Sequence, residues 1–193
     1  MTDESDEPIE DEDDRGGALR SWIVTFLVAL GVFALLRVFV IGVYYVPSGS
    51  MLDTIQLGDQ LIGEKVSYHF SDPKPGDVVT FDDPDGSGQT LIKRVIATGG
   101  QTVDLREGVL YIDGVAQDEP YVEGRPSYPL DQYASFLSGP ISYPYTVPDG
   151  CIWVMGDNRV NSLDSRYFGA VSIDSVSSHA RFIYWPFTDI RGL

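Results

Sequence analysis

A long apolar segment near the start of the chain constrains the fold more than any other feature. From Trp22 to Val46 the sequence WIVTFLVALGVFALLRVFVIGVYYV contains one charged residue, Arg37. A helix needs about 20 mainly apolar residues to cross a bilayer. Residues 18–40 meet that requirement, and the long side chains of Arg20 and Arg37 near their ends can reach the interface. The sequence therefore predicts one transmembrane helix over residues 18–40.

The end of this segment has a different composition. VFVIGVYYV is rich in β-branched and aromatic residues, which favour a strand leaving the membrane, and Tyr44 and Tyr45 suit the lipid headgroup layer. A cleaved secretory signal would have a basic start and a small-residue cleavage site, whereas this chain starts with acidic residues and no such site follows. A buried core helix stays open as an alternative, although the segment is long for one.

The charge of the chain is concentrated at its start. The net charge is −16, and residues 1–15 hold nine acidic residues and one arginine, which is half of that total. With so little to bury, residues 1–17 are expected to form a disordered acidic tail. Arg15 and Arg20 favour an N-terminus on the cytoplasmic side, which would leave residues 41–193 outside. The acidic balance also excludes nucleic acid as an expected partner.

Short strand patterns dominate the rest of the chain. The 12 prolines and 20 glycines mark frequent turns. Between them lie candidate strands in QLIGEKV, GDVVTF, TLIKRVIAT, TVDL, GVLYIDGV, CIWVMGDN and ARFIYWPF. Residues 119–150 are rich in Pro, Tyr and Ser and are expected to be an irregular insertion. The predicted fold is mainly β, with one N-terminal transmembrane helix and an extracytoplasmic domain over 41–193.

A serine-rich turn follows the apolar segment. YYVPSGSMLDTI places Ser48, Gly49 and Ser50 directly behind a proline. It is either a plain turn or a nucleophile held beside a membrane. A serine nucleophile needs a base to accept its proton. The chain has two histidines, His69 and His179, and neither lies in a recognisable local signature.

Lys93 is the other candidate base. In LIKRVI the strand period places the lysine and the following arginine on opposite faces, each between apolar residues. A free lysine has a pKa of about 10.4, and a base near neutral pH needs about 7–8. Full burial can lower a lysine pKa by up to ~3–5 units. A serine–lysine pair is therefore chemically possible, although periodicity alone favours an edge-strand lysine that reaches water.

Two further features bear on metal and redox chemistry. Cys151 is the only cysteine, so the chain can form no intrachain disulfide and no cysteine-based metal cluster. The loop MGDNRVNSLDSRYFG is dense in hydrogen-bonding groups and predicts either a structured polar network or a solvated turn. Asp157 and Asp164 lie in it without histidine or regular ligand spacing, so no metal site is expected.

Four of these motifs occur in one order: PSGSM at 47–51, GDVVTF at 76–81, IKRV at 92–95 and GDNRVNSLDSRYFG at 156–169. In them, and in the preceding apolar helix, the chain resembles the bacterial type I signal peptidases from about residue 20 to its end. The resemblance implies a signal-peptidase-like β fold in a bacterial cytoplasmic membrane. It also implies an endopeptidase that removes signal peptides after small residues, as in Ala-x-Ala, with the lipid bilayer as a partner and no cofactor or metal.

The resemblance also implies roles for single residues. Ser50 would be the nucleophile and Lys93 its general base. Ser48 would place its hydroxyl beside the Ser50 N–H in an oxyanion hole. Ser162 would hydrogen-bond the lysine and orient it.

A supporting polar network is implied as well. Arg94 would pair with Asp157, and Asp164 with Arg166. Met51 would lie near the nucleophile in an apolar, membrane-facing region.

The chain departs from the family pattern at Asp53, where the family usually has proline. The aspartate would loosen the turn or replace the stiffness by an Asx-type hydrogen bond. Two rival functions are a serine–lysine peptidase of another kind, such as a self-cleaving repressor, and a membrane-anchored binding protein without catalysis. The membrane segment argues against the first, and the intact serine and lysine positions against the second.

Overall fold

The computed structural model describes residues 12–193, and the chain divides into two compact units, one ending at Phe39 and the other running from Val40 to Leu193. The first 11 residues of the expected acidic tail lie outside the described residues. Helix α1 (Glu12–Phe39) begins six residues earlier than residue 18. Residues 12–17, which were expected to belong to the disordered tail, are therefore helical.

Helix α1 has the properties of a membrane span. Over Gly16–Phe39 it is long and apolar enough to cross a bilayer, and it is the one such helix in the part of the chain that is described. Its large apolar side chains are exposed, among them Trp22 at 74% and Phe26 at 67%. An exposed apolar surface of this extent fits a transmembrane segment.

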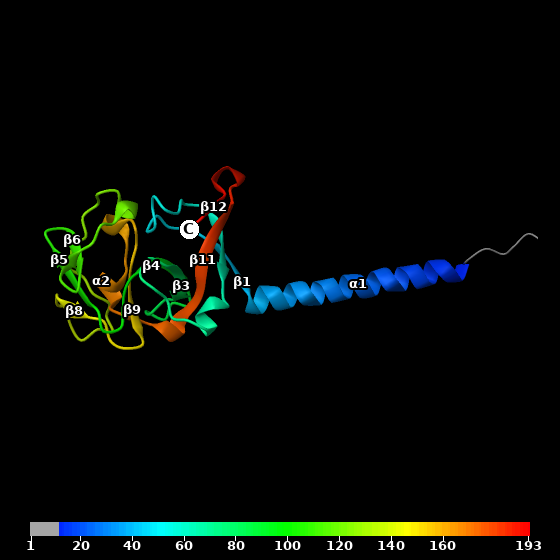
Figure 1. Ribbon diagram of the computed structural model, residues 1–193, viewed down its shortest axis with the longest axis horizontal. Coiled ribbons are helices and arrows are strands. Elements are labelled where there is room, and N and C mark those ends of the chain that lie inside the picture. Colours follow the sequence, from blue (N-terminus) through cyan, green and yellow to red (C-terminus); the bar gives the residue numbers. More distant parts are fainter. Residues whose placement is uncertain (1–11) are drawn as a thin grey trace, which may run out of the picture. The chain divides into compact units, whose positions relative to one another are not determined.

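The second unit is mainly β, as predicted, and is built on an eight-stranded sheet (Figure 1). The strands run in the order β1-β2-β11-β3-β4-β9-β10, with β12 paired to β11, and every pairing is antiparallel. Their bounds are β1 Ile41–Tyr45, β2 Gln60–Glu64, β3 Val78–Asp82, β4 Thr90–Thr98, β9 Cys151–Met155, β10 Val171–Ser172, β11 Val176–Trp185 and β12 Arg191–Gly192.

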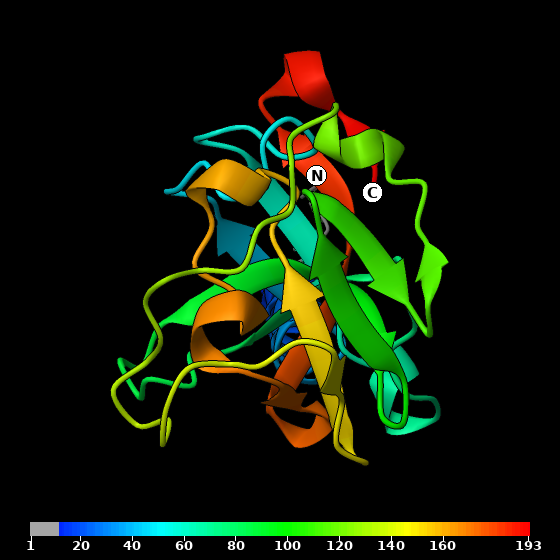
Figure 2. The same ribbon diagram turned by 90° about the vertical axis from the view of Figure 1, so that its left-hand side faces the viewer.

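A smaller four-stranded sheet lies against the end of the first, as Figure 2 shows for the green strands β5 and β6 beside the yellow β9. Its order is β7-β6-β5-β8, with bounds β5 Thr102–Arg106, β6 Val109–Ile112, β7 Val115–Ala116 and β8 Tyr145–Thr146. Trp153 and Met155 of β9 share one buried cluster with Val103 and Leu110 of this sheet. The candidate strands in TVDL and GVLYIDGV are therefore present, and they form the hairpin of β5 and β6 that packs against β9.

The remaining elements are short. Helix α2 spans Ser165–Phe168, and five 3-10 turns cover Ser67–His69, Pro120–Val122, Arg159–Asn161, Ile173–Ser175 and Phe187–Asp189. The segment 119–150 contains one of these turns and strand β8, so it is largely irregular, as expected.

Strand β4 lies inside the large sheet, between β3 and β9. Lys93 of β4 is only 4% exposed, and Val95, two residues further along the same face, is fully buried. The alternative of a lysine that reaches water is therefore wrong, because Lys93 is buried even though only β3 pairs with β4 at this position.

Candidate active site

The turn that follows β1 is held to the core by two apolar side chains. Met51 and Ile55 are fully buried and pack with Val46 and Leu61. A backbone hydrogen bond of 2.8 Å from Ile55 N to Met51 O closes the turn. The expectation of a membrane-facing Met51 is wrong, since its side chain serves instead as the anchor that fixes the neighbouring Ser50.

Ser50 and Lys93 meet although they are 43 residues apart in the sequence. The Lys93 Nζ lies 2.9 Å from the Ser50 Oγ and donates a second hydrogen bond of 2.9 Å to the carbonyl oxygen of Ile92. Ser50 itself is 8% exposed. A buried amine in contact with a serine hydroxyl can exchange a proton with it.

The environment of Lys93 favours the neutral amine. Burial lowers the pKa of Lys93 to about 8, while the nearby carboxylates of Asp164, Asp157 and Asp83 oppose this shift. Desolvation prevails because the amine is removed from water, whereas the carboxylates of Asp157 and Asp164 have arginine partners. Roughly a tenth of the molecules would then carry a neutral Lys93 at pH 7.

Asp157 joins the lysine strand to the turn that bears Ser50. Its carboxylate accepts two hydrogen bonds from Arg94, Nε to Oδ1 at 2.9 Å and Nη2 to Oδ2 at 2.7 Å. The Thr54 hydroxyl donates to the same carboxylate at 2.5 Å. The expected Arg94–Asp157 pair is therefore present, and through Thr54 it also fixes residues 47–55. This segment carries Ser50 and is called the nucleophile turn below, after the role that the resemblance implies for that serine.

The second expected pair, Asp164 with Arg166, is present as well. The guanidinium donates from Nε to Oδ1 and from Nη2 to Oδ2, both at 2.9 Å, and both side chains are buried. Asp164 also accepts from Gly156 N at 3.0 Å, and Arg166 donates to the Arg159 carbonyl at 2.8 Å. A buried ion pair is costly unless such further hydrogen bonds satisfy it. The loop is therefore a structured network, and the solvated-turn alternative is wrong.

Ser162 does not make the hydrogen bond that was expected for it. Its Oγ is buried and has no hydrogen-bond partner among the described residues, so the hydrogen bond to Lys93 that the resemblance implies is absent. The physical reason is that the Lys93 amine is aimed at Ser50 Oγ and Ile92 O instead. The loop nevertheless holds the Ser162 hydroxyl against Gly156, close to the Ser50 carbonyl.

Ser48 lies at the surface of a groove beside the pair. The groove has a volume of about 320 Å³ and is lined by residues 43–48, Ser50, Thr80 and residues 89–93. Ser48 is exposed, so its hydroxyl is open to a molecule bound there. The two walls come from β1 with the turn after it, and from β4 with the residue before it.

Asn158 holds the nucleophile turn, a role that the sequence did not reveal. Its backbone N–H donates to the Ser50 carbonyl at 3.1 Å, and its side-chain Nδ2 donates to the Gly49 carbonyl at 2.9 Å. The composition of the loop indicated a polar network, but it did not indicate that Asn158 binds the segment around Ser50. The two segments are 109 residues apart in the sequence. Thr54 was missed for the same reason.

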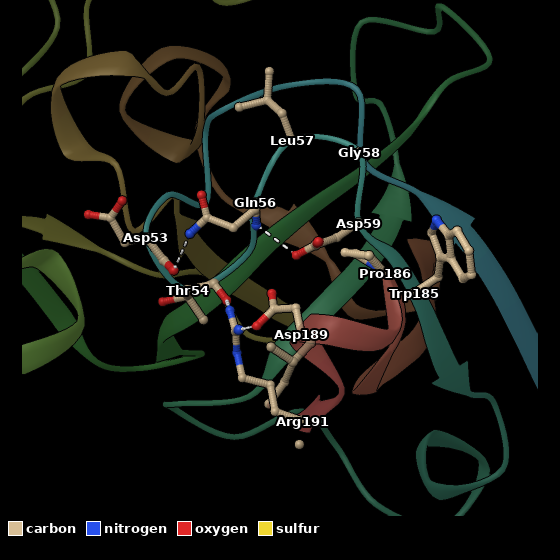
Figure 3. A pocket seen from close by; sticks show the side chains of 12 residues that line it. Asp53, Thr54, Gln56, Leu57, Gly58, Asp59, Trp185, Pro186, Asp189 and Arg191 are labelled. Atoms are coloured by element: carbon tan, nitrogen blue, oxygen red, sulfur yellow. Dashed lines mark hydrogen bonds and ion pairs between the residues drawn. The ribbon is translucent and has the colours of Figure 1, made fainter.

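The far side of the nucleophile turn is also fixed, as Figure 3 shows. The Gln56 backbone N–H donates to Asp59 at 2.8 Å, and its side chain donates to the Asp53 carbonyl at 3.0 Å. Arg191 of β12 donates to the Thr54 carbonyl at 2.7 Å. The strand that ends the chain therefore helps to keep Ser50 in place.

The histidines are engaged elsewhere. His179 stacks on Tyr68 with 5.5 Å between ring centroids and lies 3.7 Å from an Asp77 oxygen. His69 is exposed. The amine that reaches the Ser50 hydroxyl is that of Lys93, so the lysine is the better candidate base.

Comparison with known proteins agrees with these motifs. Residues 19–185 match the family model described as signal peptidase, peptidase S26. The chain is 42% identical over 171 residues to a probable signal peptidase I-1 of Synechocystis, covering 85% of this chain and 81% of the relative. It is 36% identical over 170 residues to a signal peptidase I of Bacillus caldolyticus, covering 87% and 91% of the two chains.

A solved signal peptidase I of Enterococcus faecalis is also similar, at 36% identity and a TM-score of 0.45, covering 56% of this chain and 97% of that one. The family model and the two relatives span most of the sequence. They identify a hydrolase that removes signal peptides from preproteins, and the apolar helix suggests association with a membrane. The chain belongs to the signal peptidase family, peptidase S26.

Proposed function

We propose that this chain is a single-pass membrane endopeptidase that cuts preproteins after small residues with a catalytic pair of Ser50 and Lys93. The observation that carries the proposal is the 2.9 Å contact between a buried lysine amine and the serine hydroxyl. The depressed lysine pKa supports it, since only a neutral amine can accept a proton.

The proposed reaction has two halves. The Ser50 Oγ attacks the scissile carbonyl carbon while Lys93 Nζ takes the hydroxyl proton, and the same proton then goes to the departing amine. Lys93 then takes a proton from water, the resulting hydroxide attacks the ester carbonyl carbon, and the proton passes from Lys93 to Ser50 Oγ as the ester C–O bond breaks. Ser48 Oγ and the Ser50 N–H are proposed to bind the negative oxygen, and losing one such donor typically costs about 2.7–4 kcal/mol in the transition state.

The groove supports an extended substrate. Strand β9 pairs with β4 only from Arg94 onward, so within the described sheet Thr90–Lys93 has β3 as its one paired neighbour. Strand β1 is paired there only with β2. A peptide lying between these two open edges could hydrogen-bond to both as an added strand.

The lipid bilayer is the second proposed partner. Besides α1, the second unit exposes Phe187 at 73%, Leu57 at 59% and Trp185 at 43%. Tryptophan and other large apolar side chains favour the membrane interface. We place the N-terminus in the cytoplasm and residues 41–193 on the outer side of a bacterial cytoplasmic membrane, in accord with Arg15 and Arg20 near the N-terminal end of the apolar segment.

Processing of a preprotein tests this function. The full chain in detergent is expected to cut a preprotein with an Ala-x-Ala site into a signal peptide and a mature protein, and mass spectrometry of these two products gives the bond that is cut. A Ser50→Ala sample serves as the blank. An intact preprotein after prolonged incubation would favour a binding protein without catalysis instead.

The pH dependence reports the state of Lys93. Because its pKa is lowered to about 8, kcat/KM is expected to rise tenfold per pH unit up to about pH 8 and then level off. A solvated lysine would extend the rise to about pH 10.4. Initial rates on a peptide without titrating groups, measured from pH 6 to 11, decide between these results.

Ser162→Ala separates a catalytic role of this hydroxyl from a structural one. The buried Ser162 Oγ has no partner among the described residues, so its removal is expected to leave the free energy of unfolding unchanged or slightly higher. If the hydroxyl engages Lys93 during the reaction, kcat falls by roughly 10- to 100-fold.

The matched control is Ser165→Ala. The Ser165 hydroxyl accepts a hydrogen bond of 2.9 Å from Val154 N, so this variant is expected to lose about 1–3 kcal/mol of stability. Its activity per folded molecule should stay close to that of the parent. An unchanged kcat in Ser162→Ala contradicts a role for that serine in the reaction.

A further inference from the structure

The segment Glu119–Ser127, with the sequence EPYVEGRPS, contacts several parts of the candidate active site. It opens the irregular insertion and contains the 3-10 turn Pro120–Val122. Its side chains reach Arg94 beside the lysine, Arg159 in the polar loop and the turn behind Ser50. No sequence motif pointed to a role for this segment.

The first contact is between Tyr121 and Arg94. The Arg94 guanidinium carbon lies 4.2 Å from the centroid of the Tyr121 ring. The same guanidinium makes the two hydrogen bonds to Asp157. The guanidinium that binds Asp157 therefore packs against the face of the Tyr121 ring. At this distance the positive charge is attracted to the ring.

The second contact is between Glu119 and Arg159. The glutamate accepts from Arg159 at 2.8 Å and 2.5 Å and from the Tyr121 hydroxyl at 2.8 Å. Arg159 is 1% exposed, also donates to the Ser127 hydroxyl, and holds the Gly156 carbonyl through its Nε at 2.9 Å. Removing either partner of a buried pair is strongly destabilising, so this contact fixes the polar loop.

The third contact is between Arg125 and the nucleophile turn. Its Nη2 lies 2.5 Å from the Asp53 carboxylate, and its Nη1 lies 3.4 Å from the Leu52 carbonyl oxygen. The Asp53 carboxylate is thus engaged by an ion pair with a distant arginine rather than by an Asx-type hydrogen bond. Both side chains are partly exposed, so this contact is the weakest of the three.

We propose that residues 119–127 are a brace that positions Ser50 and Lys93 for reaction. The proposal rests on the proposed function of that pair. Tyr121 is its central positioning residue: it touches no reacting atom, but it contacts Arg94 and hydrogen-bonds the glutamate that holds Arg159. Small displacements of catalytic groups are costly, since about 1 Å can lower a rate ~100-fold.

The brace also affects the charges that surround Lys93. The carboxylates that face Lys93 are those of Asp164, Asp157 and Asp83. Arg94 neutralises Asp157, and Arg166 neutralises Asp164. If Arg94 moves away from its carboxylate, Lys93 meets more negative charge and holds its proton more tightly. The acid limb of the pH profile then shifts to higher pH.

The test compares three tyrosine variants of the full chain in detergent. Tyr121→Leu removes the ring that contacts Arg94, and Tyr121→Phe keeps the ring but removes the hydroxyl. Tyr111→Leu is the matched control, because Tyr111 of the small sheet has Arg106 at 4.8 Å from its ring centroid. Each variant is assayed for kcat, KM, the pH profile and the melting temperature.

The expected result is a loss in kcat of roughly 3- to 30-fold for Tyr121→Leu, with little change in KM. Its acid limb should move to higher pH. Tyr121→Phe should stay within about threefold of the parent, and Tyr111→Leu should keep both kcat and the pH profile. Should Tyr121→Leu fail to fold, Arg125→Ala at the exposed end of the brace is expected to lower kcat by a few-fold.

Two results overturn the proposal in distinguishable ways. If Ser50→Ala cleaves as well as the parent, the proposed function fails, and the brace fails with it. If Ser50→Ala is inactive but Tyr121→Leu matches the parent in kcat and pH profile, the brace alone is wrong. An equal loss in Tyr121→Leu and Tyr111→Leu would also refute it, because the effect would then be general destabilisation.

Discussion

Lys93→Arg is expected to abolish preprotein cleavage, with a fall in kcat of at least ~1,000-fold. Arginine keeps the positive charge and much of the length of lysine but cannot lose its proton at any working pH. A buried guanidinium next to Ser50 could therefore not accept the hydroxyl proton. Single-turnover cleavage of a preprotein, measured up to pH 10, is the decisive assay. Substantial residual activity in this variant would remove Lys93 as the base.

Lys93→Met is the companion variant. It should also be inactive, but it should make the folded protein more stable at neutral pH. The folded protein holds the lysine pKa at about 8, below the ordinary lysine value of 10.5, so the unfolded chain binds this proton more tightly. The resulting cost to stability is about 3 kcal/mol below pH 8, because each pKa unit is worth ~1.4 kcal/mol. It disappears as the pH rises to about 10.5.

Denaturant unfolding of the parent and of Lys93→Met at pH 7 and pH 10 tests whether the buried lysine lowers the free energy of unfolding. Methionine fills a similar volume without a charge, so the variant should be inactive yet more stable at pH 7, and the gap should narrow at pH 10. A variant that is less stable than the parent at pH 7 would contradict the inferred burial cost.

Gly156→Ala is expected to have the second large effect, a loss of roughly 100-fold or more in kcat. A Cβ at this position would come closer than 3.0 Å to the Ser162 side chain and to the backbone carbonyl oxygen of Ser50. Backbone cannot rotate away as a flexible side chain can, so the nucleophile turn and the polar loop must separate. Overpacking of this kind also costs about 1–3 kcal/mol of stability.

Gly139→Ala is the matched control, since a Cβ there meets nothing within 4 Å. This variant should keep the activity and the stability of the parent. Melting temperatures measured beside kcat separate lost packing from lost catalysis. If Gly156→Ala is as active as Gly139→Ala, the close approach of the loop to Ser50 is not needed for the reaction.

The sequence predicted the contact between Ser50 and Lys93 better than the contacts that hold these two residues in place. Alternation in LIKRVI allowed Lys93 to be buried, and the tertiary packing around β4 decided in favour of burial. The two ion pairs came from the resemblance and are present. The hydrogen bond of Ser162 to the lysine is not, because the amine is directed to other acceptors.

The contacts that sequence reasoning missed join segments far apart in the chain. Thr54 meets Asp157 across 103 residues, and Arg125 meets Asp53 across 72. Local patterns report which face of a strand is apolar, but they carry no information on which distant loop satisfies a polar group. Such partners are fixed only when the two sheets and the insertion pack together.

By itself, the sequence determined the apolar helix, the mainly β character of the rest and the absence of an intrachain disulfide. These properties follow from length, composition and short periodicities, which act between near neighbours. Only the tertiary structure decided that the amine of Lys93 lies against the hydroxyl of Ser50 and that its pKa is lowered to about 8. The reason is that desolvation depends on every atom packed around a group, wherever those atoms lie in the chain.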